Sequence, residues 1–261
     1  MTETLISEKN PLLKQVRRAV SRGSLTDDGF AVAESFHLLE EALASRCEVH
    51  SVIVAESAQT GVSGYLGRLN RTRVVIVPDS VFAQIATTET TQGIIALVRP
   101  PAWTLDQLLS GRSLMMVLDG VQDPGNAGAI LRAAEAFGST GVAFLKGSVS
   151  PYNPKCLRSS AGSVFRLPIA VSVEDGLVLD AVARHGIALY AAQPRATKLV
   201  SSADLSASCA IIIGGEGRGV NPALRAHSTG LRIPTSGVES LNAAVAAGVL
   251  LYEAQRQRTE S

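Results

Sequence analysis

Hydrophobic positions in the first part of the chain switch several times between helical and strand spacing. Near the N-terminus, Leu12, Leu13, Val16 and Val20 recur every three or four residues, which predicts an amphipathic helix. Further helices are expected over 30–44, 63–70 and 81–86, and short apolar strands over 50–54, 73–77 and 94–98. This part of the chain therefore predicts a small α/β domain.

The second part of the chain repeats the strand-then-helix pattern. Strands are expected over 115–119, 142–145, 164–170, 187–191, 210–213 and 231–233, and helices over 127–137, 177–185 and 241–258. Strands rich in β-branched residues that alternate with helices are typical of a parallel sheet buried on both faces. We therefore predict an α/β fold whose second part is a mostly parallel sheet with helices on both faces.

Two adjacent prolines, Pro100 and Pro101, separate these parts. Proline fixes the backbone φ angle and restricts the residue before it, so neither a helix nor a central strand continues through the pair. A length of 261 residues is sufficient for two small domains. We predict one domain over 1–98, a linker over 99–112 and a second domain over 113–261.

Composition indicates a well-packed core but no overall signature of a nucleic-acid binder. Hydrophobic residues make up 46% and charged residues 18%, while the net charge is only +1. Any nucleic acid would therefore have to bind a local basic patch. Lys14, Arg17 and Arg18 lie on the predicted N-terminal helix, where RNA contact and a solvated surface are both open interpretations.

Cysteine usage and the N-terminal sequence favour a soluble cytoplasmic protein. Cys47, Cys156 and Cys209 lie far apart and form no CxxC pair, so neither a metal site nor a disulfide framework is expected. The first residues, MTETLISEKN, contain no apolar signal core. No later stretch reaches the roughly 18 apolar residues that a membrane span needs, so no membrane partner is expected.

Three polar, glycine-rich loops carry the candidate chemistry, and each follows an apolar strand of the second part. The first loop begins at Asp119, turns at Pro124-Gly125, and leads through Asn126 to Arg132 on the following helix. Two local explanations are available, a helix cap for Asn126 and an ordinary surface charge for Arg132. The functional alternative is that the planar fork of Arg132 binds a phosphate or carboxylate.

The second loop, within IIIGGEGRGV, places Glu216 among four glycines that allow a ligand to approach the backbone closely. It has neither the G-x-G-x-x-G spacing of a dinucleotide site nor the Lys-Ser/Thr ending of a P-loop. The third loop, IPTSGVESLN, brings Ser240 and Asn242 to the start of the final helix. Ser240 is interpreted either as the cap of that helix or as a hydroxyl beside a reacting group.

Together the three loops resemble the motifs of the SpoU/TrmH-type family of SPOUT methyltransferases. The matching residues are Gly125, Asn126, Gly128 and Arg132 in the first motif, Gly214, Glu216 and Gly219 in the second, and Ile233, Pro234, Ser240, Leu241 and Asn242 in the third. The motifs stand in the family's order, and the resemblance covers about residues 114–258. Ordered together, they are far more specific than any one of them alone.

Residues 1–98 resemble the substrate-binding domain that is often fused ahead of that catalytic domain. The resemblance is carried by AESFHLLEEAL and TTQGIIALV, and Ser35 stands where relatives often have glycine. It implies a small ribosomal-protein-like α/β domain that grips structured RNA. In the second domain it implies a deep trefoil knot, bound S-adenosylmethionine and a homodimer.

The resemblance also implies roles for individual residues. The methyl-transfer site would contain Asn126, Arg132, Glu216, Ser240 and Asn242; the cofactor would be held by Gly214, Gly215, Gly219, Ile233 and Leu241; and RNA would meet Lys155 and Arg158 as well as the N-terminal basic residues. Arg132 is expected to clamp a phosphate or to act as a base, and Glu216 to orient Arg132 or accept a hydrogen bond.

The implied reaction is S-adenosylmethionine-dependent methylation of a ribose 2′-hydroxyl in structured RNA. Ribosomal RNA is favoured as the substrate. Two alternatives remain open, a tRNA 2′-O-methyltransferase and a non-catalytic RNA-binding protein of the same fold.

Overall fold

The computed structural model describes residues 2–4, 10–62, 64–65, 69 and 72–260. The chain divides into two compact units, the first made of Met1–Pro101 with Tyr152–Arg166 and the second of Ala102–Pro151 with Leu167–Ser261. The segment Tyr152–Arg166 thus departs from the predicted boundary, because it interrupts the second part of the sequence yet packs with the first unit. Its helix α7 (Pro154–Ser160) contacts strand β2 (Ala31–Glu34), and its Leu157 is fully buried.

The first unit is built on a mixed five-stranded sheet. Its strands lie in the order β1 (Thr2–Thr4), β4 (Arg73–Val77), β3 (Glu48–Ala55), β5 (Ile94–Arg99) and β2. Pairs β1–β4 and β4–β3 are parallel, whereas β5 runs antiparallel to both β3 and β2. Its helices are α1 (Pro11–Arg22), α2 (Phe36–Ala44), α3 (Gln59–Val62) and α4 (Asp79–Ala83).

The apolar stripe predicted for the N-terminal helix is part of this unit's core. Leu12, Leu13 and Val16 of α1 are buried against one face of the sheet, together with Phe82 of α4. The expected small α/β domain is therefore present. The helix predicted over 63–70 lies largely outside the described residues.

The single helix predicted over 30–44 is wrong. Ala31–Glu34 instead forms β2, the edge strand beside β5, and the helix starts only at Phe36. Between them Ser35 has a φ of 144°, a conformation that side chains rarely adopt and that glycine tolerates. The hydroxyl of Ser35 accepts a hydrogen bond from the Leu38 N–H, so this residue caps α2.

The second unit contains a seven-stranded sheet. Its strands lie in the order β10 (Lys198–Leu199), β12 (Thr229–Arg232), β9 (Ala188–Ala192), β11 (Cys209–Gly214), β6 (Leu114–Asp119), β7 (Gly141–Leu145) and β8 (Ile169–Val173). Each described pairing is parallel, which confirms the predicted mostly parallel sheet. The strand predicted over 164–170 starts later than expected, because Ser163–Phe165 forms a 3-10 turn.

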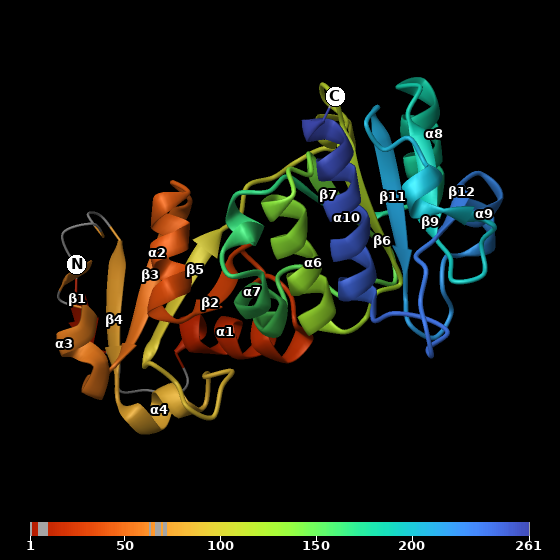
Figure 1. The fold of residues 1–261 in the computed structure, drawn as a ribbon. Coiled ribbons are helices and arrows are strands. Elements are labelled where there is room, and N and C mark those ends of the chain that lie inside the picture. The colour runs from red at the N-terminus through yellow and green to blue at the C-terminus, as the bar shows by residue number, and fades with distance from the viewer. Residues whose placement is uncertain (1, 5–9, 63, 66–68, 70–71, 261) are drawn as a thin grey trace. The chain divides into compact units, whose positions relative to one another are not determined.

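Helices cover both faces of this sheet, also as predicted (Figure 1). Helices α6 (Pro124–Ala136) and α10 (Ala243–Thr259) lie side by side on one face. The other face carries α5 (Leu105–Leu108), α8 (Asp175–Arg184) and α9 (Pro222–Ala226), and the first of these lies within the predicted linker. Among the described residues, no helix has the length and hydropathy of a membrane span.

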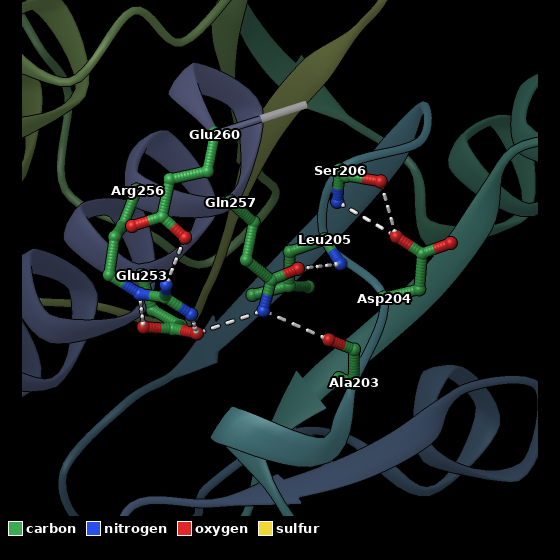
Figure 2. Close-up of polar contacts among 8 residues, drawn as sticks. All are labelled: Ala203, Asp204, Leu205, Ser206, Glu253, Arg256, Gln257 and Glu260. Atoms are coloured by element: carbon green, nitrogen blue, oxygen red, sulfur yellow. Dashed lines mark hydrogen bonds and ion pairs between the residues drawn. The ribbon is translucent and has the colours of Figure 1, made fainter.

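The end of α10 is anchored to the unit by hydrogen bonds to backbone carbonyls. The Arg258 guanidinium donates to the carbonyl oxygens of Leu205 at 2.9 Å, Ser113 at 2.8 Å, and Ala207 at 2.7 Å. The preceding residue, Gln257, binds the backbone of Ala203 and Leu205 through its side-chain amide (Figure 2). These bonds fix the helix whose N-terminus carries the third loop.

Candidate active site

The three predicted loops meet at one edge of the parallel sheet. Strands β6 and β11 are parallel neighbours whose registers pair Asp119 with Gly214, so the loops that follow them start side by side. The third loop follows β12, which is separated from β11 only by β9. In an open α/β sheet, ligands bind at the carboxyl ends of the strands where the connections diverge, and this edge has that geometry.

A glycine-lined cavity of about 200 Å³ opens at this edge. Its lining includes all five residues predicted to hold the cofactor, namely Gly214, Gly215, Gly219, Ile233 and Leu241. An ideal Cβ at Gly214 would overlap the backbone of Gly219 and Val220, and one at Gly215 would overlap the Gly120 carbonyl. Only glycine therefore lets the second loop fold back beside the first.

The glycine-lined cavity suits an adenosyl group. The side chains of Leu231, Ile233 and Leu241 give it apolar walls, while the glycines leave backbone groups accessible. A flat heterocycle can pack between such walls and form hydrogen bonds with the backbone at its edge. Gln193, Pro194 and Thr235 also line the cavity but were not predicted. The available signals were the position of Gln193 and Pro194 directly after the apolar strand β9 and that of Thr235 within the third loop.

Three predicted polar residues meet in a hydrogen-bonded triangle. The Asn126 amide nitrogen donates to Glu216 Oε1 at 2.6 Å, and the Asn242 amide nitrogen donates to the same oxygen at 3.3 Å. The Asn242 amide also donates to Asn126 Oδ1 at 3.1 Å. Of the two roles expected for Glu216, the structure thus shows the acceptor of hydrogen bonds. The triangle joins all three loops.

The helix caps differ from the local explanations given for these residues. Helix α6 begins at Pro124 and is capped by Asp123, whose carboxylate accepts from the Asn126 N–H at 2.7 Å. Helix α10 is capped by Asn242 and not by Ser240; its Oδ1 accepts from the N–H groups of Ala244 and Val245. Asn126 is therefore not a helix cap, whereas Asn242 both caps α10 and belongs to the triangle.

Ser240 and Arg132 lie apart from the triangle's hydrogen bonds. Ser240 is exposed and lines the glycine-lined cavity. Arg132 is exposed on α6, and its side chain has no hydrogen-bond or ion-pair partner among the described residues. An exposed guanidinium without a protein partner is available to bind an anion.

A second cavity, of about 620 Å³, lies at the same edge of the sheet. Its lining includes Asp119, Gly120, Gln122, Asn126, Lys146 and Arg218, none of which lines the glycine-lined cavity. Glu216, Gly215 and Gly219 line both, so the second loop forms the wall between them. Within the described part of the chain, no cluster of three His, Cys, Asp or Glu is placed to hold a metal.

The residues predicted to contact RNA lie on two helices of the first unit. On α1, Lys14 is exposed, Arg17 donates to Gln84 at 2.5 Å and Arg18 forms an exposed ion pair with Asp27 at 3.4 Å. On α7, Lys155 is exposed, and Arg158 donates to the Thr87 hydroxyl at 2.5 Å. Exposed ion pairs are weak and are readily exchanged for a phosphate.

Two family models match this chain. The SpoU rRNA methylase family matches residues 113–252, and the MRM3-like substrate binding domain matches residues 10–96. An uncharacterized tRNA/rRNA methyltransferase of Synechocystis sp. is 35% identical, over 98% of this chain and 94% of that protein. The 23S rRNA (guanosine(2553)-2′-O)-methyltransferase RlmP of Bacillus subtilis is 32% identical, over 94% of this chain and 96% of that protein.

Solved structures agree with these matches. The SpoU methyltransferase AviRb from Streptomyces viridochromogenes, in complex with AdoMet, gives a TM-score of 0.89 at 28% identity and covers 97% of this chain and 100% of its own. An RNA 2′-O ribose methyltransferase gives a TM-score of 0.80 at 31% identity, covering 98% of this chain and 100% of its own. The resemblance seen in the three loops is confirmed, and the chain belongs to the SpoU rRNA methylase family.

Proposed function

We propose that this protein methylates the ribose 2′-hydroxyl of a guanosine in 23S ribosomal RNA, with S-adenosylmethionine as the methyl donor. The observation that carries the proposal is the Asn126–Glu216–Asn242 triangle beside the glycine-lined cavity. The family membership supports the reaction class, and the B. subtilis relative is named for 2′-O-methylation of a 23S rRNA guanosine.

Five residues would hold the cofactor in the glycine-lined cavity. Ile233 and Leu241, which line this cavity, would supply apolar contacts, and the backbone groups of Gly214, Gly215 and Gly219 would supply hydrogen bonds. When bound there, S-adenosylmethionine supplies an electrophilic methyl group. The chain's own contribution is to bring a ribose hydroxyl into line with that group and to favour loss of its proton.

Arg132 would stabilise negative charge at the reacting ribose. A guanidinium stays protonated in proteins, which argues against a literal general base. As a cation without a protein partner among the described residues, Arg132 can clamp the RNA phosphate and stabilise the developing alkoxide. Asn126, Ser240 and Asn242 would orient the ribose, while Glu216 keeps the two amides in place.

The first unit would grip structured RNA through its two basic helices. Lys14, Arg17 and Arg18 on α1 and Lys155 and Arg158 on α7 supply positive charge for phosphate contacts. This local patch agrees with a net charge of only +1 for the whole chain. Proteins recognise structured RNA largely through its shape and its 2′-hydroxyls, so a small basic patch is sufficient for contact.

We also propose a homodimer, formed through the exposed side of α10. Val245, Val249 and Tyr252 recur there at helical spacing and are exposed, which is unusual for apolar side chains on a core helix. The deep trefoil knot implied by the family resemblance belongs to this proposal as well. A cytoplasmic location is proposed because ribosomal RNA is its substrate.

The proposal is tested by methylation of total RNA with purified protein and radiolabelled S-adenosylmethionine. We expect label in the 23S rRNA fraction and 2′-O-methylguanosine on nucleoside analysis. Label confined to the tRNA fraction would replace the substrate with tRNA. Absence of both labelled RNA and cofactor binding would favour a non-catalytic RNA-binding protein.

A further inference from the structure

The second cavity is placed to receive the base of the nucleotide that is methylated, an inference that rests on the proposed function. Its wall toward the glycine-lined cavity is the second loop, with Gly215, Glu216 and Gly219 lining both spaces. Asn126 lines only the second cavity and donates to Glu216 across that wall. A ribose held at the triangle would therefore face the methyl donor in the glycine-lined cavity on one side. Its base would lie on the other side, in the second cavity.

The second cavity is also the larger of the two, about 620 Å³ against about 200 Å³. Enzymes that modify structured nucleic acids commonly take the target nucleotide out of its stack and hold its base in a pocket. A purine turned out of the RNA requires such a space next to the reacting ribose. The cavity meets that requirement within a single unit of the chain.

Asp119 presents a fixed acceptor in this cavity. Its backbone oxygen accepts from the Gly215 N–H at 2.8 Å, and its carboxylate Oδ2 accepts from the Asn221 N–H at 2.6 Å. Asp119 is thereby held at both ends of the glycine-rich loop, its backbone by Gly215 and its carboxylate by Asn221. Its other oxygen, Oδ1, has no hydrogen-bond partner among the described residues, although the side chain is half-buried and lines the cavity.

Positive charge lies in the same lining. Arg218 is exposed on the glycine-rich loop without a side-chain partner among the described residues. Lys146 also lines the cavity and is ion-paired with Glu174. Guanine alone among the RNA bases has two neighbouring donors, N1–H and the N2 amino group, next to the acceptors O6 and N7. A carboxylate and a guanidinium are the side chains that match those two sets.

We propose that the second cavity binds guanine and that Asp119 determines this choice. Oδ1 of Asp119 accepts from the N2 amino group and N1–H of the base, and Arg218 donates to O6 and N7. Adenine loses the Asp119 contact, because it has no N1–H or N2 amino group. It also loses half of the Arg218 contact, because it keeps N7 but places an amine where guanine has O6. Hypoxanthine, the base of inosine, lacks only the amino group and loses part of the Asp119 contact.

The test compares three RNAs that differ at one nucleotide. The methylated nucleotide is first located in an unmodified 23S rRNA transcript, and a short synthetic RNA is then made with guanosine, inosine or adenosine there. Single-turnover methylation by the wild-type protein should fall in that order, with about 10- to 100-fold between guanosine and adenosine. In Asp119→Asn the amide oxygen still accepts from the Asn221 N–H, but the amide NH2 group, a donor, takes the place of the free acceptor Oδ1. The rates on the three RNAs should therefore converge to within about 3-fold.

Asp180→Asn, the same change at an exposed position on α8, is the matched control and should keep the wild-type ratios. An unchanged affinity of Asp119→Asn for S-adenosylmethionine would show that the loop remains in place. Equal loss on all three RNAs would make Asp119 a loop support only and overturn the proposal. Equal wild-type rates on the three RNAs would overturn the guanine pocket but not the proposed function. Absence of methylation of the 23S transcript would overturn both.

Discussion

At the scale of single residues, the glycines of the second loop set the shape of the site. Two of them, Gly215 and Gly217, are separated by a single residue but differ in their surroundings. A Cβ at Gly215 would overlap the Gly120 carbonyl, whereas one at Gly217 would meet nothing within 4 Å. The two positions therefore separate the effect of close backbone approach from that of added bulk.

Gly215→Ala should displace the second loop and weaken binding of S-adenosylmethionine by about 10-fold or more. A loss of about 1.4 kcal/mol of binding free energy from the displaced contacts is enough for a 10-fold effect. Isothermal titration calorimetry measures this affinity. Gly217→Ala, the matched control, should bind the cofactor like the wild-type protein. Similar affinities for the two variants would contradict the assigned role of Gly215.

Arg132 gives the second prediction at this scale. Because its side chain has no partner among the described residues, Arg132→Ala should change the free energy of unfolding by less than about 0.5 kcal/mol. Loss of the alkoxide-stabilising charge should lower kcat about 100-fold or more, with cofactor affinity retained. Arg225→Ala, an exposed arginine of α9, serves as control, and normal turnover by Arg132→Ala would refute the role.

The sequence predicted which loops come together better than it predicted the local geometry of their residues. Asn126, Glu216 and Asn242 are far apart in the chain, and the ordered motifs alone linked them before the structure showed their hydrogen bonds. The caps were misassigned because several residues near each helix start have side chains that can cap. Asp123 competes with Asn126, and Asn242 competes with Ser240, so spacing alone does not decide between them.

At the scale of helices and strands, α10 connects stability with chemistry. Its cap, Asn242, uses Oδ1 for the helix and its amide nitrogen for the triangle. The two halves of one side chain thus serve different purposes. Aspartate caps a helix about as well as asparagine but has no amide donor.

Asn242→Asp should therefore keep the melting temperature near that of the wild-type protein while lowering kcat, because a second carboxylate would lie beside Glu216 without a donor. Asn242→Ala should lose the cap as well, which costs about 1 kcal/mol of stability. Calorimetric melting and steady-state methylation measure the two effects. If Asn242→Asp were as active as the wild-type protein, the triangle would have no part in catalysis.

The other end of α10 supplies a stability prediction. Arg258 is half-buried, and its guanidinium binds four backbone carbonyls, of Leu205, Arg112, Ser113 and Ala207. Arg258→Ala would leave buried acceptors without a donor and should destabilise the protein by about 2–4 kcal/mol in urea unfolding.

Arg256→Ala is the matched control for this change. Arg256 pairs with Glu253 and Glu260 and, chiefly through its hydrogen bond, lowers the pKa of the Glu253 carboxyl (Figure 2). Its side chain is 42% exposed, and exposed pairs contribute about 0–1 kcal/mol. Equal destabilisation by the two changes would contradict the anchoring role of Arg258.

Periodicity located most helices and strands but failed where a strand runs directly into a helix. The apolar run before Ser35 is continuous with the helix after it, and only the backbone turn at Ser35 separates them. Short elements such as α5 were also missed, since they contain too few residues to show a period. The packing of Tyr152–Arg166 with the first unit depends on contacts distant in sequence, which no local pattern contains.

At the scale of the whole molecule, the alternation of strands and helices was enough to predict a parallel sheet covered on both faces. It was not enough to order the strands, because β6 pairs with β11, far along the chain, as well as with β7. That long-range pairing brings the loops together and so creates the site. The order of the strands in the sheet is known only from the structure.

The exposed apolar side of α10 carries the last prediction. Val245, Val249 and Tyr252 are 53%, 36% and 57% exposed, and Tyr252 makes an edge-on ring contact with Phe137 at the end of α6. A contiguous apolar strip on two neighbouring helices is typical of a subunit interface. If the protein is a dimer through this strip, Val249→Asp would bury an unpaired charge and should raise the dissociation constant of the dimer about 100-fold.

Sedimentation equilibrium measures that constant directly. Leu177→Asp is the matched control, because Leu177 is an equally apolar side chain, 56% exposed, on α8 at the opposite face of the sheet. The Leu177 variant should remain dimeric while the Val249 variant dissociates. A wild-type protein that sediments as a monomer at all concentrations, or a Val249→Asp variant that stays dimeric, would exclude this strip as the interface and leave its exposure to be explained by another partner.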